Sequence, residues 1–143
     1  MSDDAIGIKI IEELAKTDFC TYFNNIEIID GSTSGIDLLF TLGNMDRVII
    51  VDAVDAGQAD GEVVKFKLRD IINMPGKTVK SFSLHDLGLE EVFALMESLK
   101  LCPDITIIGI KPKVITYGDK LSPEIESKIP EIILLIRQEL IIF

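Results

Sequence analysis

Short runs of apolar residues, separated by polar turns, are the main pattern in this chain. The clearest run covers residues 47–53, where four β-branched residues precede Asp52. A run this short is typical of a strand that is buried on both faces, as in a parallel sheet covered by helices. Residues 26–30 and 105–110 have the same character, so they predict two further buried strands.

A fourth predicted strand differs from these three. Residues 62–68 alternate only in part between apolar and polar side chains, and the polar turn before them, residues 55–61, is too short for a crossover helix. We therefore expect an antiparallel strand at an edge of the sheet. Lys65 and Lys67 would protect that edge from pairing with another chain.

Helical periodicity occurs between the predicted strands. Asp3 or Asp4 would cap a helix that ends near Lys16. The spacing of the apolar residues gives this helix one buried face, formed by Ile6, Ile10, Ile11 and Leu14. A small-residue turn at 31–35 would start a second helix around residues 36–42, and a third would end near Leu99. Residues 69–83 are predicted to form a long loop.

The C-terminal tail has a clear helix start. Ser122 is the expected cap, and Pro123 fits the first helical position because its missing N–H is not needed there. Pro130 must interrupt or kink the helix, since its ring clashes with the preceding turn. Together with the strands, these helices predict one α/β domain over residues 1–143, with a mostly parallel twisted sheet and one antiparallel edge strand.

Composition excludes several classes of function. The chain has 143 residues, is 48% hydrophobic and carries a net charge of −10. Because it contains no apolar run of about 18 residues, we expect no membrane insertion. The net negative charge disfavours nucleic acid as a partner. The first residues do not resemble a signal peptide, and Cys20 and Cys102 are far apart, so we expect a reduced, cytoplasmic protein.

Three side chains could form a metal site. Asp4 lies at a predicted helix start, Asp52 at a predicted strand end, and His85, the single histidine, in a loop before a helix. A doubly wound sheet gathers such termini along one rim. Two carboxylates and one imidazole leave coordination positions open for water or substrate. Taken singly, Asp4 is more simply a helix cap and His85 a surface residue.

Motifs of other enzyme classes are missing from the sequence. There is no GxSxG elbow, no Walker loop and no HExxH helix. Cys20 follows an apolar helix, and Cys102 precedes Pro103 with no second histidine to spare, so covalent hydrolysis is disfavoured.

At the residues of this candidate site, the sequence resembles the hydrogenase maturation proteases. The similarity lies in four segments that follow the family's order: residues 3–7 (DDAIG), 30–35 (DGSTSG), 50–55 (IVDAVD) and 83–89 (SLHDLGL). The resemblance implies a three-layer α/β/α fold. It differs from the family pattern at the front, because the family's first strand and its Gly-Asn turn would precede Met1. We therefore expect a chain that lacks that central strand.

The resemblance also implies a function. Family members are endopeptidases that remove the C-terminal extension of a nickel-loaded [NiFe]-hydrogenase large-subunit precursor. The implied metal ligands are Asp4, Asp52 and His85, which would bind nickel that is carried by the substrate, with zinc or cadmium as substitutes in vitro. Asp52 would in addition have a catalytic role, the orientation of the attacking water.

Two other functions stay open from the sequence. A strand followed by the turn 31–35 and a helix has the form of a phosphate-binding turn, as in flavodoxin-like flavin or nucleotide binders. A non-catalytic chaperone could also recognise a metallated partner through the same residues. The sequence contains no signal for an oligomeric state.

Overall fold

The fold is that of a computed structural model, which describes residues 6–16, 26–28, 41–55, 57–72, 81–82, 89–101, 103–111 and 122–141. The helices are α1 (Ile6–Ala15), α4 (Leu68–Ile72), α5 (Leu89–Ser98), α6 (Pro123–Glu126) and α7 (Ile129–Ile141). The strands are β1 (Arg47–Asp55), β2 (Val63–Lys67), β3 (Ser81–Phe82) and β4 (Asp104–Ile110). None of the described helices is long and apolar enough to cross a bilayer.

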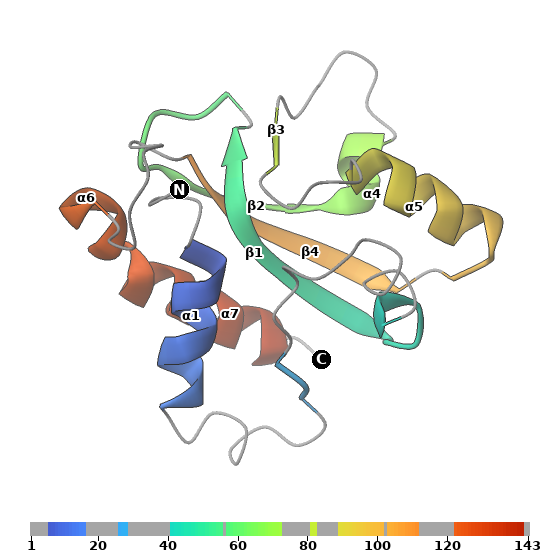
Figure 1. The fold of residues 1–143 in the computed structure, drawn as a ribbon, viewed down its shortest axis with the longest axis horizontal. Helices are drawn as coiled ribbons and strands as arrows, with labels where there is room; N and C mark the ends of the chain where they lie inside the picture. The colour runs from blue at the N-terminus through green and yellow to red at the C-terminus, as the bar shows by residue number, and fades with distance from the viewer. Residues whose placement is uncertain are drawn as a thin grey trace.

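The described strands form one open, mixed sheet in the order β2-β4-β1-β3 (Figure 1). Strands β1 and β4 are parallel, in a register that runs from Arg47 opposite Asp104 to Ala53 opposite Ile110. Strand β2 pairs antiparallel with β4 at one edge, as predicted. Strand β3 is a second antiparallel strand that the sequence did not predict. The predicted α/β class is confirmed.

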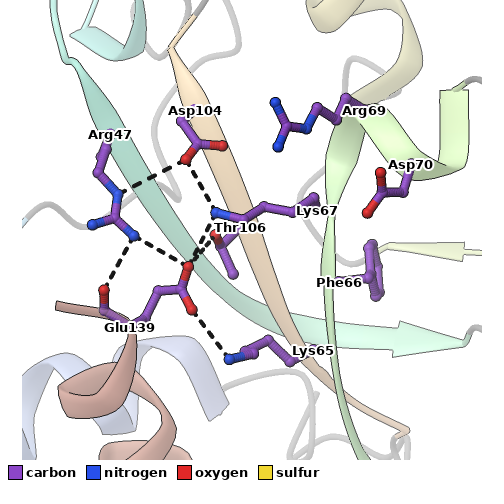
Figure 2. A pocket seen from close by; sticks show the side chains of 9 residues that line it. All are labelled: Arg47, Lys65, Phe66, Lys67, Arg69, Asp70, Asp104, Thr106 and Glu139. Carbon is purple, nitrogen blue, oxygen red and sulfur yellow. Dashed lines mark hydrogen bonds and ion pairs between the residues drawn. The ribbon is translucent and has the colours of Figure 1, made fainter. Parts of the chain in front are cut away.

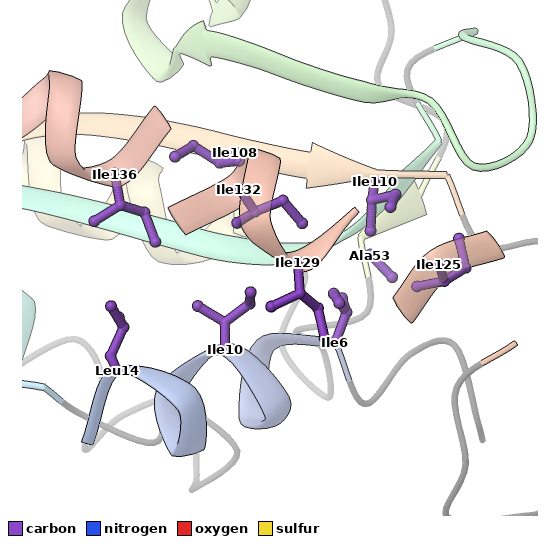
Figure 3. Packing of buried hydrophobic residues seen from close by; sticks show 10 residues of the cluster. All are labelled: Ile6, Ile10, Leu14, Ala53, Ile108, Ile110, Ile125, Ile129, Ile132 and Ile136. Carbon is purple, nitrogen blue, oxygen red and sulfur yellow. The ribbon is translucent and has the colours of Figure 1, made fainter. Parts of the chain in front are cut away.

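One face of the sheet is covered by α1, α6 and α7 (Figure 3). Its core consists of buried aliphatic side chains from these helices and from β1 and β4: Ile6, Ile10, Leu14, Ala53, Ile108, Ile110, Ile125, Ile129, Ile132 and Ile136. Complete burial of one such side chain stabilises the fold by about 1.5–3 kcal/mol. The predicted buried face of the first helix is thus confirmed at Ile6, Ile10 and Leu14, although Ile11 is only half-buried.

The opposite face has a second, separate core. It is formed by Leu42, Ile50, Leu68, Met96, Ile105 and Ile107. These side chains come from a short helical stretch at residues 41–43, from α4 and α5, and from the alternate positions of β1 and β4. Helices therefore pack on both faces of the sheet, which explains why the central strands are apolar without interruption.

Helix α1 approaches β1 unusually closely at Gly7. A Cβ atom built on Gly7 would lie 2.7 Å from the carbonyl oxygen of Val51. Any side chain at this position would collide with the backbone of β1, which cannot rotate away as a side chain can. The glycine therefore fixes the start of α1 against the second half of β1.

The C-terminal tail divides into two helices as the sequence predicts. The hydroxyl oxygen of Ser122 accepts a hydrogen bond from the backbone N–H of Ile125, and Pro123 is the first residue of α6. Helix α6 ends at Glu126, and Pro130 lies in the first turn of α7, where a missing N–H is tolerated.

Two predicted boundaries are wrong. Strand β1 does not end at Asp52 but continues to Asp55, because Val54 and Asp55 pair with Phe82 and Ser81 of β3. Residues 69–83 are not loop throughout, since α4 and β3 occupy the two ends of this segment. The spacing of Leu68, Ile71 and Ile72 is that of a helical turn, which accounts for α4.

The predicted strand at residues 26–30 is not found in its described part. Residues 26–28 are not in a strand, while residues 29–30 lie outside the described residues. Ile26 and Ile28 still pack, partly buried, against the core on the α1 and α7 side. Apolar burial can therefore explain this sequence pattern without a pairing strand.

Substitution of Gly7 tests the contact between α1 and β1. Gly7→Ala should lower the free energy of unfolding by about 1–3 kcal/mol, since the added methyl group forces the helix away from the strand. Chemical denaturation measures this change. Gly43→Ala is the control: its Cβ would lie 2.6 Å from Leu101 Cδ1, the end of a side chain that can move. Equal losses in both variants would contradict this interpretation of Gly7.

Candidate functional site

Asp52 is a buried carboxylate in the second half of β1, with 4% of its surface exposed. Side chains alternate between the faces of a strand, so Asp52 lies on the same face as Ile50, toward the core formed with α4 and α5. Its register partner in β4 is Gly109, which in turn lies opposite Val64 of β2. No side chain from β4 therefore stands beside the Asp52 carboxylate on that face.

Asp4 and His85, the other two predicted ligands, are close in sequence to α1 and β3. Both of these elements contact β1 near Asp52. Asp4 precedes by two residues the start of α1, where Gly7 meets the carbonyl of Val51. His85 follows by three residues the last residue of β3, Phe82, which pairs with Val54. Both segments thus approach β1 within two residues of Asp52.

Several predicted features lie outside the described residues. They are Asp4, His85, the turn at residues 31–35 and both cysteines. Within the described residues, no group of three or more His, Cys, Asp or Glu side chains could bind a metal ion. Asp52 is the one predicted ligand that the structure locates.

A second polar cluster, which the sequence analysis missed, lies at the other end of the sheet around Glu139 (Figure 2). The Glu139 carboxylate accepts hydrogen bonds from Lys65 at 3.1 Å, Lys67 at 3.0 Å and Thr106 at 3.0 Å. A nitrogen of the Arg47 guanidinium group is 3.2 Å from the same carboxylate and 3.1 Å from the Glu139 carbonyl oxygen. Helix α7 is thereby bound to β1, β2 and β4.

The environment of Glu139 determines its protonation. Burial alone would raise the pKa of this carboxyl group, but hydrogen bonds from Lys67, Lys65 and Thr106 and the charge of Lys67 outweigh that effect. Together they lower the pKa from 4.5 to about 2. In the described part of the chain, every buried side-chain nitrogen and oxygen has a hydrogen-bond partner. The Glu139 carboxyl group is therefore ionised and hydrogen-bonded at neutral pH.

Lys65 and Lys67, predicted to protect the sheet edge, also have partners that the sequence did not predict. Both ammonium groups turn toward α7 and bind Glu139, and Lys67 also lies 3.1 Å from Asp104. Their position on the edge strand β2 is as predicted, and the acid that they meet there, Glu139, comes from a distant helix. The alternation of Lys65 and Lys67 showed that they share a face, but not which acid they meet.

A cavity of about 610 Å³ adjoins this cluster. It is lined by Arg47, Lys65, Phe66, Lys67, Arg69, Asp70, Asp104, Thr106 and Glu139. The cavity lies where β1 and β4 begin, at the opposite end of β1 from Asp52. The structure therefore has two separate polar regions, one at each end of the central strand pair.

Removal of the Glu139 charge should destabilise the fold strongly. In Glu139→Gln the cationic groups of Arg47, Lys65 and Lys67 lose their shared buried partner, which should lower the free energy of unfolding by roughly 3 kcal/mol. The matched control is Glu131→Gln on the same helix, where the exposed carboxylate is 3.7 Å from Lys128. The control should change stability by less than about 0.5 kcal/mol in urea denaturation. A loss below about 1 kcal/mol in Glu139→Gln would contradict a stabilising role.

The same group predicts an acid-dependent loss of stability. The folded-state pKa of Glu139, about 2, is below the ordinary value of 4.5, so the unfolded chain takes up this proton first as the pH falls. The contribution, on the order of 3 kcal/mol, should be complete above pH 4.5 and disappear progressively between pH 4.5 and 2. Unfolding of the wild type and Glu139→Gln across this range measures it. A constant difference in stability down to pH 2.5 would contradict it.

Comparison with known proteins identifies the family. The model of the family described as hydrogenase maturation protease matches residues 8–139. The chain is 32% identical over 130 residues to the hydrogenase expression/formation protein HupD of Rhodobacter capsulatus, which covers 90% of this chain. It spans only 60% of the length of HupD. It is also 30% identical over 131 residues to the hydrogenase 2 maturation protease of Escherichia coli K12, covering 90% of this chain and 77% of that protein.

A solved structure has the same fold. The hydrogenase maturating endopeptidase HybD from E. coli superposes with a TM-score of 0.74 at 28% identity, covering 97% of this chain and 86% of HybD. The family match extends over most of the chain, including both core faces and the strand that carries Asp52. The chain belongs to the hydrogenase maturation protease family.

Proposed function

We propose that this chain is a cytoplasmic endopeptidase that removes the C-terminal extension of a nickel-loaded [NiFe]-hydrogenase large-subunit precursor. Membership of the maturation protease family supports the reaction type. The observation that carries the assignment of the site is Asp52, a buried carboxylate near the end of a central strand. In open α/β sheets, ligands bind beyond the carboxyl ends of the strands.

The proposed nickel ligands are Asp4, Asp52 and His85, and the nickel belongs to the substrate. Chain connectivity supports this grouping. Asp4 is three residues from Gly7, and His85 is three residues from Phe82, so neither Cα atom can be more than about 11 Å from those anchors. Both anchors contact β1 within two residues of Asp52. Two carboxylates and an imidazole are suitable donors for nickel.

The proposed ligand set would use nickel recognition to bring the scissile peptide bond of the precursor to Asp52. A divalent ion lowers the pKa of a bound water and polarises a carbonyl group. The Asp52 carboxylate could orient that water and accept its proton during attack. Gly109, the register partner of Asp52, places no β4 side chain directly beside this carboxylate.

Cleavage of the precursor tests this proposal. Wild-type protein should shorten a nickel-loaded large-subunit precursor but leave a nickel-free precursor intact, as followed by mass spectrometry. His85→Ala and Asp52→Asn should each reduce the cleavage rate by at least about 100-fold, the effect expected from loss of a ligand or general base. Circular dichroism should show that the variants remain folded.

Asp46→Asn is the matched control for Asp52→Asn. It makes the same change at an exposed residue just before β1, at the opposite end of the strand, and should leave the rate unchanged. A folded His85→Ala variant with a normal rate would contradict the ligand assignment. Formation of a complex with the precursor, without any change in precursor mass, would favour the chaperone alternative over the endopeptidase.

A further inference from the structure

The cavity beside Glu139 has a charge opposite to that of the chain as a whole. Four cationic side chains line it, from Arg47, Lys65, Lys67 and Arg69, against three carboxylates. The cavity therefore has one net positive charge, although the whole chain has a net charge of −10. An anion is attracted to such a local excess of positive charge, particularly where protein walls reduce the solvent screening.

Three of the four cations already have internal partners. Arg47, Lys65 and Lys67 bind Glu139, while Arg47 and Lys67 also face Asp104, at 3.9 and 3.1 Å. These ion pairs tie α7 to the sheet. The cluster therefore satisfies its own carboxylates without Arg69.

Arg69 is the remaining cation. It is exposed, at the start of α4, and forms no hydrogen bond or ion pair in the part of the chain that the structure describes. Its guanidinium group is directed toward the side of the cavity where Lys67 and Asp104 lie (Figure 2). A guanidinium group presents a planar set of donors that fits a carboxylate with two parallel hydrogen bonds.

We propose that this cavity binds a carboxylate group, with Arg69 as its main anchor and Lys67 as a second source of positive charge. A single negative charge matches the net charge of the lining, whereas a doubly charged phosphate would leave an excess of negative charge beside Asp104, Asp70 and Glu139. The ring of Phe66 forms an apolar part of the wall. The carboxylate would belong to a small organic acid or to the end of a peptide chain.

The site is independent of the proposed peptidase chemistry. Arg47 and Asp104 are the first residues of β1 and β4, so the cavity lies at the amino ends of these strands. Asp52 is five residues further along β1. Binding at the cavity can therefore be measured without a hydrogenase precursor and without nickel, and its failure would leave the proposed function unaffected.

Arginine side-chain NMR tests the proposal directly. The chain has three arginines, at positions 47, 69 and 137, so each Nε–H signal can be assigned by substitution. Titration with acetate and with benzoate at low salt should shift the signals of Arg69 and Arg47 in a saturable way, with Kd in the millimolar range. Low salt is needed because screening weakens ion pairs at exposed sites.

Two arginine substitutions, each of which removes one positive charge, test whether carboxylate binding depends on Arg69. Arg69→Gln should weaken binding at least about tenfold, because it removes the bidentate partner. Arg137→Gln removes an arginine that does not line the cavity and should change Kd less than twofold. Equal weakening in both variants, or no saturation up to 100 mM ligand, would overturn the proposal.

Further ligands distinguish a peptide chain end from a small organic acid, and a carboxylate from a phosphate. A short peptide with a free terminal carboxylate is compared with its amide. Tighter binding of the free peptide than of acetate would identify a chain end as the ligand. Equal or tighter binding of benzoate would identify a small organic acid. Inorganic phosphate that binds tenfold more tightly than either carboxylate would overturn the assignment to carboxylates.

Discussion

The parallel pairing of β1 with β4 is the interaction on which the rest of this fold depends. Each edge strand of the described sheet is attached to one member of this pair, β2 to β4 and β3 to β1. Both helical layers pack against the alternate side chains of the same two strands. Strand β1 contributes Arg47 to the polar region around Glu139 and carries Asp52 five residues further along. The two polar regions therefore lie toward opposite ends of this pair.

Elements with strong local signals could be predicted from the sequence. The strand around Ile50 and the strand beginning at Asp104 are continuous apolar runs, and α1 repeats its isoleucines with helical spacing. The Ser122 cap and Pro130 mark helix boundaries through backbone chemistry that acts within a few residues. Such features depend on near neighbours in the chain, so a sequence contains enough information to locate them.

Features that depend on distant residues could not be predicted in the same way. Glu139 is 92 residues from Arg47 and 74 from Lys65. Its helical spacing from Ile132 and Ile136 places it on the buried face of α7, but its own segment does not indicate which cations it meets there. Strand β3 has two residues, and its existence depends on the position of β1. Asp52 could be selected because it interrupts an apolar strand. Its grouping with Asp4 and His85 rests on family resemblance and on the direction of neighbouring elements.

The short pairing between β3 and β1 has a consequence for local dynamics. Only two register pairs join these strands, whereas seven join β1 to β4. Separation of β3 would break few backbone hydrogen bonds, so it requires much less free energy than global unfolding. Amide hydrogens in the β3 pairing should therefore exchange with solvent through local opening, long before those between β1 and β4. The edge of β1 nearest Asp52 would then be transiently open to an extended segment of another chain.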